Sequence, residues 1–138
     1  MFYIVLTRLD NNKKGAGMSE ASWCDITTEN AEALAEFYEK VMGWKKEPVD
    51  MGGYSDYVMM KPDGTPVGGI CHKKGVNETL PGGWINYFTV ANLSNSLEHV
   101  ESLGGKRVGD VRHHGKDSFC IIFDPTGAPC ALYEKGSD

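Results

Sequence analysis

The chain has 138 residues, with 14 basic and 19 acidic side chains and a net charge of −5. This length suits one domain that buries a sizeable core without disulfides or a structural metal. The acidic balance argues against a nucleic-acid partner. The apolar run at residues 2–6 is too short for a signal peptide or a membrane span, so we expect a cytoplasmic protein with no membrane partner.

The four cysteines show no C-x-x-C pair: Cys24, Cys71, Cys120 and Cys130. Free cysteine is among the most frequently buried residue types, so structural thiols are the expectation for all four. No phosphate loop, dinucleotide fingerprint or nucleophile elbow is present, which leaves nucleotide binding and acyl-enzyme chemistry without support. We predict no cofactor.

The sequence contains an internal repeat at a spacing of about sixty residues, which indicates two copies of one structural unit. Trp23 falls on Trp84 and Gly43 on Gly104, and "PDGTPVGGICHKKG" lies against "PTGAPCALYEKG". The predicted organisation is an N-terminal extension over residues 1–20, a first module over 21–74, a linker over 75–82 and a second module over 83–138. The extension is expected to hold an edge strand and a flexible connector.

Each module has the pattern of a strand, a helix and three strands. In the first, aromatic and β-branched residues at 22–28 predict a strand, and Thr28 or Asn30 then caps a helix that Gly43 ends. Strands follow at 44–49, 54–60 and 65–72. The second copy predicts strands at 84–90, 107–111, 118–123 and 129–134, with its helix between the first two.

A βαβββ unit has a helix for only one face of its sheet, so the other face must curl or find a partner. The predicted fold class is therefore α+β, with tandem βαβββ modules that form a curved, cup-like mixed sheet with helices outside. A concave pocket for a small molecule is the expected consequence.

The paired modules, together with "FYEKVMGW", "ESLGG" and "FDPTGAPCALYE", resemble the vicinal oxygen chelate superfamily, which includes glyoxalase I, bleomycin resistance proteins and extradiol dioxygenases. The resemblance covers about residues 20–135 and implies the fold, while reaction type stays open. It also implies a homodimer, because relatives commonly pair modules across subunits, whereas closure of the cup by the two modules of one chain is the alternative.

Metal-using members of that superfamily place a His or Gln early on the first strand of each module and a Glu on the last. Carried over, these positions fall on Trp23, on Gly68, on Trp84 or Ile85, and on Ala131. None of these side chains offers a lone pair to a divalent ion, so the resemblance implies no metal site of the usual kind.

Asp25 and His72 are the candidate acid–base residues. Asp25 lies two residues after Trp23 and therefore shares its strand face, where it serves as a general base, a partner for a cationic group or a structural ion pair. His72 ends the fourth strand and has the pKa of a proton carrier, but strand-end histidines are commonly surface residues.

Two further interpretations involve His113 and His114, which lie in "RHHGK". We expect this segment to be a solvated loop or, less favoured, a flap over the pocket. An unrecognised metal site built from histidines, Asp25 and a cysteine is the weaker alternative, since none of them stand at a recognised ligand spacing.

Large aromatic and apolar groups gather near the expected cup, where core packing competes with ligand stacking as their role. The predicted ligand-binding residues are Trp23, Tyr54, Tyr57, Met59, Trp84, Asn86, Tyr87 and Cys120. The leading hypothesis is a metal-independent protein that binds a small aromatic or amphipathic molecule, with the two tryptophans flanking one cavity. The alternative is a lyase, isomerase or dioxygenase of the superfamily. Such an enzyme would use Asp25 and His72 in acid–base chemistry, or an unrecognised metal site.

Overall fold

The computed structural model describes residues 23–137, which form two compact units, Trp23–Trp84 and residues 85–137. The N-terminal extension with its predicted edge strand and connector lies outside the described residues. Each unit has the predicted order of strand, helix and three strands, so the tandem βαβββ architecture is confirmed. No helix in the described part of the chain is long and apolar enough to cross a membrane.

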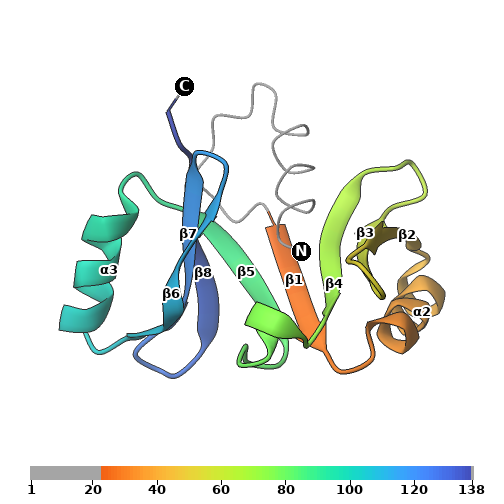
Figure 1. Cartoon of the computed structure of the whole chain (residues 1–138), viewed down its shortest axis with the longest axis horizontal. Helices are drawn as coiled ribbons and strands as arrows, with labels where there is room; N and C mark the ends of the chain where they lie inside the picture. The colour runs from red at the N-terminus through yellow and green to blue at the C-terminus, as the bar shows by residue number, and fades with distance from the viewer. Residues whose placement is uncertain (1–22, 138) are drawn as a thin grey trace. The chain divides into compact units, whose positions relative to one another are not determined.

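The first unit pairs its strands in the order β2-β3-β4-β1, with β1 parallel to β4 and the other pairs antiparallel (Figure 1). Its elements are β1 (Trp23–Thr28), α2 (Ala31–Met42), β2 (Lys45–Asp50), β3 (Ser55–Met60), β4 (Pro66–His72) and a short 3-10 turn at Gly75–Asn77.

Helix α2 begins and ends at the residues that the sequence indicates. Asn30 is its N-cap, and the side-chain oxygen accepts a hydrogen bond from the backbone N–H of Ala33 at 3.1 Å. Gly43 ends the helix with a φ of 73°, and its N–H donates to Glu39 O. A residue with a Cβ is strained at that φ, which explains the glycine.

The second unit repeats this plan in the order β5-β8-β7-β6, with β5 parallel to β8. Its elements are β5 (Trp84–Thr89), which begins at the last residue of the first unit, α3 (Leu93–Ser102), β6 (Lys106–His114), β7 (Asp117–Phe123) and β8 (Pro129–Glu134).

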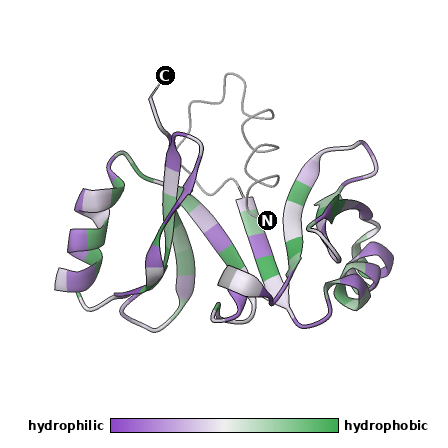
Figure 2. Cartoon of the chain, viewed as in Figure 1, coloured by the Kyte–Doolittle hydropathy of each residue, from purple (hydrophilic) through white to green (hydrophobic). Residues whose placement is uncertain are grey.

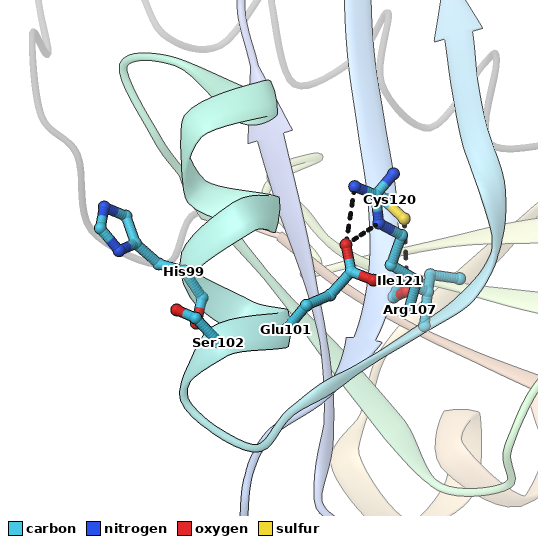
Figure 3. A network of polar contacts seen from close by, with 6 residues as sticks. All are labelled: His99, Glu101, Ser102, Arg107, Cys120 and Ile121. Carbon is cyan, nitrogen blue, oxygen red and sulfur yellow. Dashed lines mark hydrogen bonds and ion pairs between the residues drawn. The ribbon is translucent and has the colours of Figure 1, made fainter.

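Side chains hold α3 in place at both of its ends. Asn92 caps the helix, as Asn30 caps α2, and Glu134 Oε1 accepts a hydrogen bond from Leu93 N at 2.6 Å. At the other end, the Arg107 guanidinium contacts Glu101 Oε1 through Nε at 3.0 Å and Nη2 at 2.9 Å (Figure 3).

In each unit the helix covers one face of the sheet. The cluster under α2 contains Ala31, Ala35, Tyr57, Met59 and Ile70, and the cluster under α3 contains Leu93, Leu97, Cys120 and Ile122. Figure 2 shows hydrophobic and hydrophilic residues alternating along β1, as a strand with two different faces requires. The other sheet face of each unit, which its helix does not cover, is called here the helix-free face.

The structure corrects the prediction for "RHHGK". His113 and His114 lie in strand β6, where they pair with Ser118 and Asp117 across a tight turn, so they form neither a loop nor a flap. Gly115, at a φ of 59°, allows the chain to reverse within two residues. The polar and glycine-containing composition that suggested a loop applies only to this short turn.

A polar face in the first unit

Three buried residues of β1 point away from α2. Trp23, Asp25 and Thr27 are 5%, 0% and 4% exposed, and they alternate with partly buried residues. One of those alternating residues, Ile26, packs against the cluster under α2. Because strand side chains alternate between faces, the three buried residues belong to the helix-free face. Asp25 therefore lies on the same face as Trp23, as the sequence predicts.

Strands β4 and β3 extend this face sideways. Thr27 pairs with Cys71 in the parallel register of β1 with β4, and Tyr57 pairs with Ile70 in the antiparallel register of β3 with β4. Asp56, next to Tyr57, therefore falls beside Cys71. The result is a row of Thr27, Cys71 and Asp56 across three adjacent strands, which are about 4.8 Å apart.

One carboxylate oxygen of Asp56 accepts a backbone hydrogen bond where the pairing of β3 with β4 ends. Its Oδ1 accepts a hydrogen bond from His72 N at 2.8 Å and lies 3.5 Å from His72 Nδ1. The His72 ring packs edge-on against Tyr54, with 5.3 Å between centroids, and Lys74 Nζ lies 4.5 Å from the Tyr54 ring centre.

Burial dominates the electrostatics of this carboxylate. Asp56 is 3% exposed, and desolvation raises the pKa of its carboxyl group above 3.8 although His72 acts to lower it. Burial removes more hydration free energy from the charged carboxylate than one hydrogen bond and a nearby histidine compensate. The charged form of the Asp56 carboxyl group is therefore destabilised relative to the protonated form.

Three buried polar atoms of this face have no hydrogen-bond partner among the described residues. They are Trp23 Nε1, Thr27 Oγ1 and Asp56 Oδ2. Native proteins pair most buried polar atoms, and leaving one unpaired costs about 1–3 kcal/mol. Three such atoms on one face indicate a place where a ligand or ordered water completes the bonding.

The thiols near this face are unsuited to nucleophilic chemistry. Burial raises the pKa of Cys71 well above 9.0, and the nearby charges of Asp25 and Asp56 raise it further. Burial, with Asp25, also raises the pKa of Cys24 to about 11. The thiolate is the reactive form, so both cysteines are held as neutral thiols.

The second unit carries aromatic rings on its helix-free face. Tyr87 and Ile121 both pair with Ala131, and Phe119 pairs with Tyr133, which places these side chains on the face opposite Cys120 and Leu132. The rings of Tyr87 and Phe119 have centroids 6.0 Å apart, and those of Phe119 and Tyr133 are stacked at 6.2 Å.

Asp117 fixes one end of this aromatic row. The Tyr133 hydroxyl donates to Asp117 Oδ2, and Gly136 N donates to Asp117 Oδ1 at 2.7 Å. The Tyr133 ring is consequently held in one orientation, and like Tyr87 and Phe119 it is buried.

A separate apolar pocket of about 300 Å³ opens on the helix side of this unit. Its lining includes Val100, Leu103, Ile122 and Pro125, and none of its lining residues was predicted as a site residue. It lies over the cluster that α3 covers, so it is distinct from the helix-free face.

The structure divides the predicted ligand-binding residues between the two faces. Trp23 and Tyr87 lie on helix-free faces. In contrast, Tyr57 and Met59 pack under α2, and Cys120 packs under α3. A ligand would have to displace a helix to reach these three, so we leave them out of the proposed site.

Trp84 also differs from the expectation that it faces Trp23. Its Nε1 donates to the Tyr38 hydroxyl at 2.9 Å, and its ring meets the rings of Tyr38 and Trp44 edge-on at 5.3 and 6.5 Å. Trp84 thus packs with α2 on the face opposite Trp23. Asn86 is exposed on the same side of β5 as Trp84, and Tyr54 lies beside His72.

The predicted acid–base pair is also split. His72 ends β4, where its Nδ1 lies 3.5 Å from Asp56 Oδ1, whereas Asp25 pairs with Gly69, three positions earlier along the ladder of β1 with β4. The residue that contacts His72 is Asp56, which the sequence reasoning missed. The period-two pattern of "SDYVMM" assigns Asp56 to a face, but only the pairing of β3 with β4 brings it to His72.

The family's metal positions do not fit a metal in this chain. The register puts Gly69, not Gly68, beside Asp25 on the helix-free face, and Trp23, Ile85 and Ala131 occupy the other three positions. A shift of register does not restore ligands, because Glu134 caps α3 and the Cys24 Sγ–H points at Val67 O. Within residues 23–137, no group of three or more His, Cys, Asp or Glu side chains is placed to hold an ion.

Two βαβββ units with helices on one face of each sheet define the vicinal oxygen chelate fold, and the chain is a member of that superfamily. Residues 23–133 match the family described as Glyoxalase-like domain, and the chain belongs to this family.

Two curated relatives come from Streptomyces. The chain is 25% identical over 130 residues to the anthracycline biosynthesis proteins DnrV of Streptomyces peucetius and DauV of Streptomyces sp. (strain C5). Each match covers 83% of this chain and 46% of the relative, so the chain spans about half the length of these relatives.

Solved structures share the fold at low sequence identity. Methylmalonyl-CoA epimerase from Mycobacterium tuberculosis is 16% identical, with a TM-score of 0.51 over 88% of this chain and 93% of that one. A glyoxalase/bleomycin resistance protein/dioxygenase superfamily member from Vibrio splendidus 12B01 is 9% identical, with a TM-score of 0.55 over 81% and 96%. These likenesses concern the fold alone.

Proposed function

We propose that this chain binds a small aromatic molecule and does so without a metal at the family's four ligand positions. The observation that carries the proposal is the residue set at those positions, Trp23, Gly69, Ile85 and Ala131. Indole offers only an N–H donor, and the other three offer no donor atom at all, so Lewis-acid chemistry has no ligands here.

The aromatic row of the second unit supports the ligand class. Tyr87, Phe119 and Tyr133 place adjacent rings on a helix-free face, where the three residues are 2%, 2% and 8% exposed, and a flat ligand inserted beside them would bind by stacking. The names of the two curated relatives place them in anthracycline biosynthesis, and anthracyclines are fused-ring aromatic compounds. We therefore choose an anthracycline as the first ligand to test.

The test is a titration of the full chain with an anthracycline that carries an amino sugar, followed by its fluorescence and by calorimetry. We expect one-to-one binding, unchanged by a chelator, with the compound recovered intact. Phe119→Leu should weaken binding roughly 3- to 10-fold, the scale of one aromatic contact.

Phe37→Leu is the matched control, since Phe37 lies on the outer surface of α2 and is 54% exposed. It should bind like the wild type. Equal affinity of wild type and Phe119→Leu would contradict the aromatic surface, and absence of any binding would contradict the proposed ligand class.

The second candidate function is an acid–base enzyme of the superfamily with Asp25 as general base. The observation in its favour is that Asp25 is 0% exposed on the helix-free face. His72 is replaced in this scheme by another acid, because it lies three ladder positions from Asp25 and contacts Asp56 instead. Chemical conversion of a bound compound, reduced about 10²- to 10⁴-fold in Asp25→Asn, would establish this function instead.

A further inference from the structure

The strongest feature that the proposed function does not use is the apolar pocket on the helix side of the second unit, called here the α3 pocket. It has a volume of about 300 Å³, and α3, the loop after it, the end of β7 and the turn that follows supply its lining. The apolar residues of this lining are Val100, Leu103, Ile122 and Pro125. Leu103 is 71% exposed, so the lining presents a large apolar side chain to water.

The internal repeat shows what fills the equivalent place in the first unit. Gly43 and Gly104 match in the repeat, lie within two residues of the last residue of their helices and have positive φ angles of 73° and 96°. The next residue is Trp44 in the first unit and Gly105 in the second, and β2 or β6 begins directly after it. The position that carries an indole side chain in the first repeat therefore carries no side chain in the second.

Trp44 packs against α2 and its cluster. Its ring stacks on Tyr38 of α2, with 5.6 Å between centroids and 22° between planes, and it contacts the cluster under that helix. The residue that corresponds to Tyr38 in the second unit is His99, which also stands five residues before the glycine and lines the α3 pocket. An aromatic ring thus occupies in the first unit the kind of space that is open in the second.

The backbone at Gly105 leaves no room for a side chain that could fill the pocket. A Cβ at this position would lie 2.7 Å from Phe123 O and 2.9 Å from Val100 Cγ1, and the Gly105 N–H donates to Val100 O at 2.8 Å. The chain therefore passes too close to α3 and β7 for any residue but glycine. A ring bound from solution can make the apolar contacts that Trp44 makes from within the chain.

We propose that the α3 pocket is a second binding site, which takes a small planar aromatic molecule of the size of indole in the place that Trp44 holds in the first repeat. A volume of about 300 Å³ lies at the lower end of the range for small-molecule pockets, about 300–1,000 Å³, which suits one or two fused rings. Aliphatic side chains and a proline offer such a ring burial of its apolar surface, and apolar cavities in proteins bind small aromatic molecules in this way. The site lies apart from the helix-free faces, so it does not rest on the proposed function.

The experiment titrates the full chain with indole and follows backbone amide chemical shifts by NMR. We expect saturable shifts at the amides of Val100 and Gly105, with a dissociation constant of about 1 mM or lower for so small a ligand. Leu103→Ala should weaken the binding of indole about threefold or more, because it removes apolar contact area from the pocket. Circular dichroism checks that this variant is folded.

Met42→Ala is the matched control. Met42 stands directly before Gly43, as Leu103 stands directly before Gly104, and it is 53% exposed. The change removes a large apolar side chain from the equivalent position of the unit in which Trp44 is already in place. Indole should therefore bind this variant like the wild type.

The outcomes also test a different occupant of the pocket, a second copy of the chain. Indole shifts that spare the residues around the α3 pocket would overturn the inference, and so would equal weakening by Met42→Ala and Leu103→Ala. If sedimentation showed a dimer that Leu103→Ala dissociates and that indole does not enter, the pocket would be a subunit contact and the inference would fail. The anthracycline titration concerns another face, so the proposed function stands or falls separately.

Discussion

At the scale of single residues, the buried carboxylate of Asp56 makes stability depend on pH. Its raised pKa means that, between 3.8 and the folded-state value, the folded protein holds a proton that the unfolded chain has released. The free energy of unfolding therefore falls as the pH rises through this window, and the loss persists above it. The charged form of Asp56 therefore lowers stability at neutral pH.

We predict that Asp56→Asn unfolds at the same or a higher urea concentration than the wild type at pH 7, with a gain of up to about 1 kcal/mol. Asparagine keeps an oxygen for the His72 N–H and removes the buried charge. His72, whose Nδ1 lies 3.5 Å from Asp56 Oδ1, remains in the variant. The advantage should shrink as the pH falls toward 3.8. A clear loss of stability at pH 7 would contradict the prediction.

Asp63 provides the comparison of opposite sign. Hydrogen bonds from Thr65 lower the pKa of the Asp63 carboxyl group, so its stabilising effect is present at neutral pH and is lost as the pH falls through the lowered value. Asp63→Asn should therefore be no more stable than the wild type at pH 7, in the same urea series.

The sequence alone could place only some of the residues of the candidate site. Alternation along 23–28 was enough to place Trp23 and Asp25 on one face, and that placement holds. The role of Asp56 depends on the register of β3 with β4, and the role of Phe119 depends on its pairing with Tyr133. Such contacts join strands distant in sequence, and no local pattern encodes their register.

At the scale of elements, the local signals were strong because capping and turn chemistry are local. Asn30 and Asn92 occupy the same position before α2 and α3, and each accepts a hydrogen bond from the backbone N–H three residues later, at 3.1 and 2.9 Å. The failure at His113 and His114 has the opposite cause, since a two-residue turn at Gly115 extends β6 beyond its sequence signal.

We predict that Asn30→Ala and Asn92→Ala each lower the free energy of unfolding by about 1 kcal/mol, the usual effect of losing an N-cap. Asn92→Ala should have the smaller effect, because the carboxylate of Glu134 also accepts from the first turn of α3. Chemical denaturation of both variants measures the difference. Glu134→Gln in the Asn92→Ala background should remove more than either change alone if the two caps substitute for one another.

At the scale of the whole molecule, membership of the family does not determine the activity. The repeat at about sixty residues and the paired modules specify the family fold, yet its usual metal positions hold Trp23, Gly69, Ile85 and Ala131. The fold needs only the alternation and the caps, which tolerate these substitutions, whereas coordination needs particular donor atoms. The architecture therefore does not by itself require the residues that metal chemistry needs.

This separation gives the last prediction, on the metal content of the full chain. Purified protein without a tag should hold far less than one ion per chain, both as isolated and after incubation with zinc, nickel, manganese or ferrous iron and removal of the excess. The reason is that coordination needs three or more suitable side chains and the described residues bring no such set together. A stoichiometric, tightly held ion in the wild type would contradict the prediction and favour the enzyme reading, whereas a metal-free wild type that still binds an aromatic ligand would leave binding as the function of this family member.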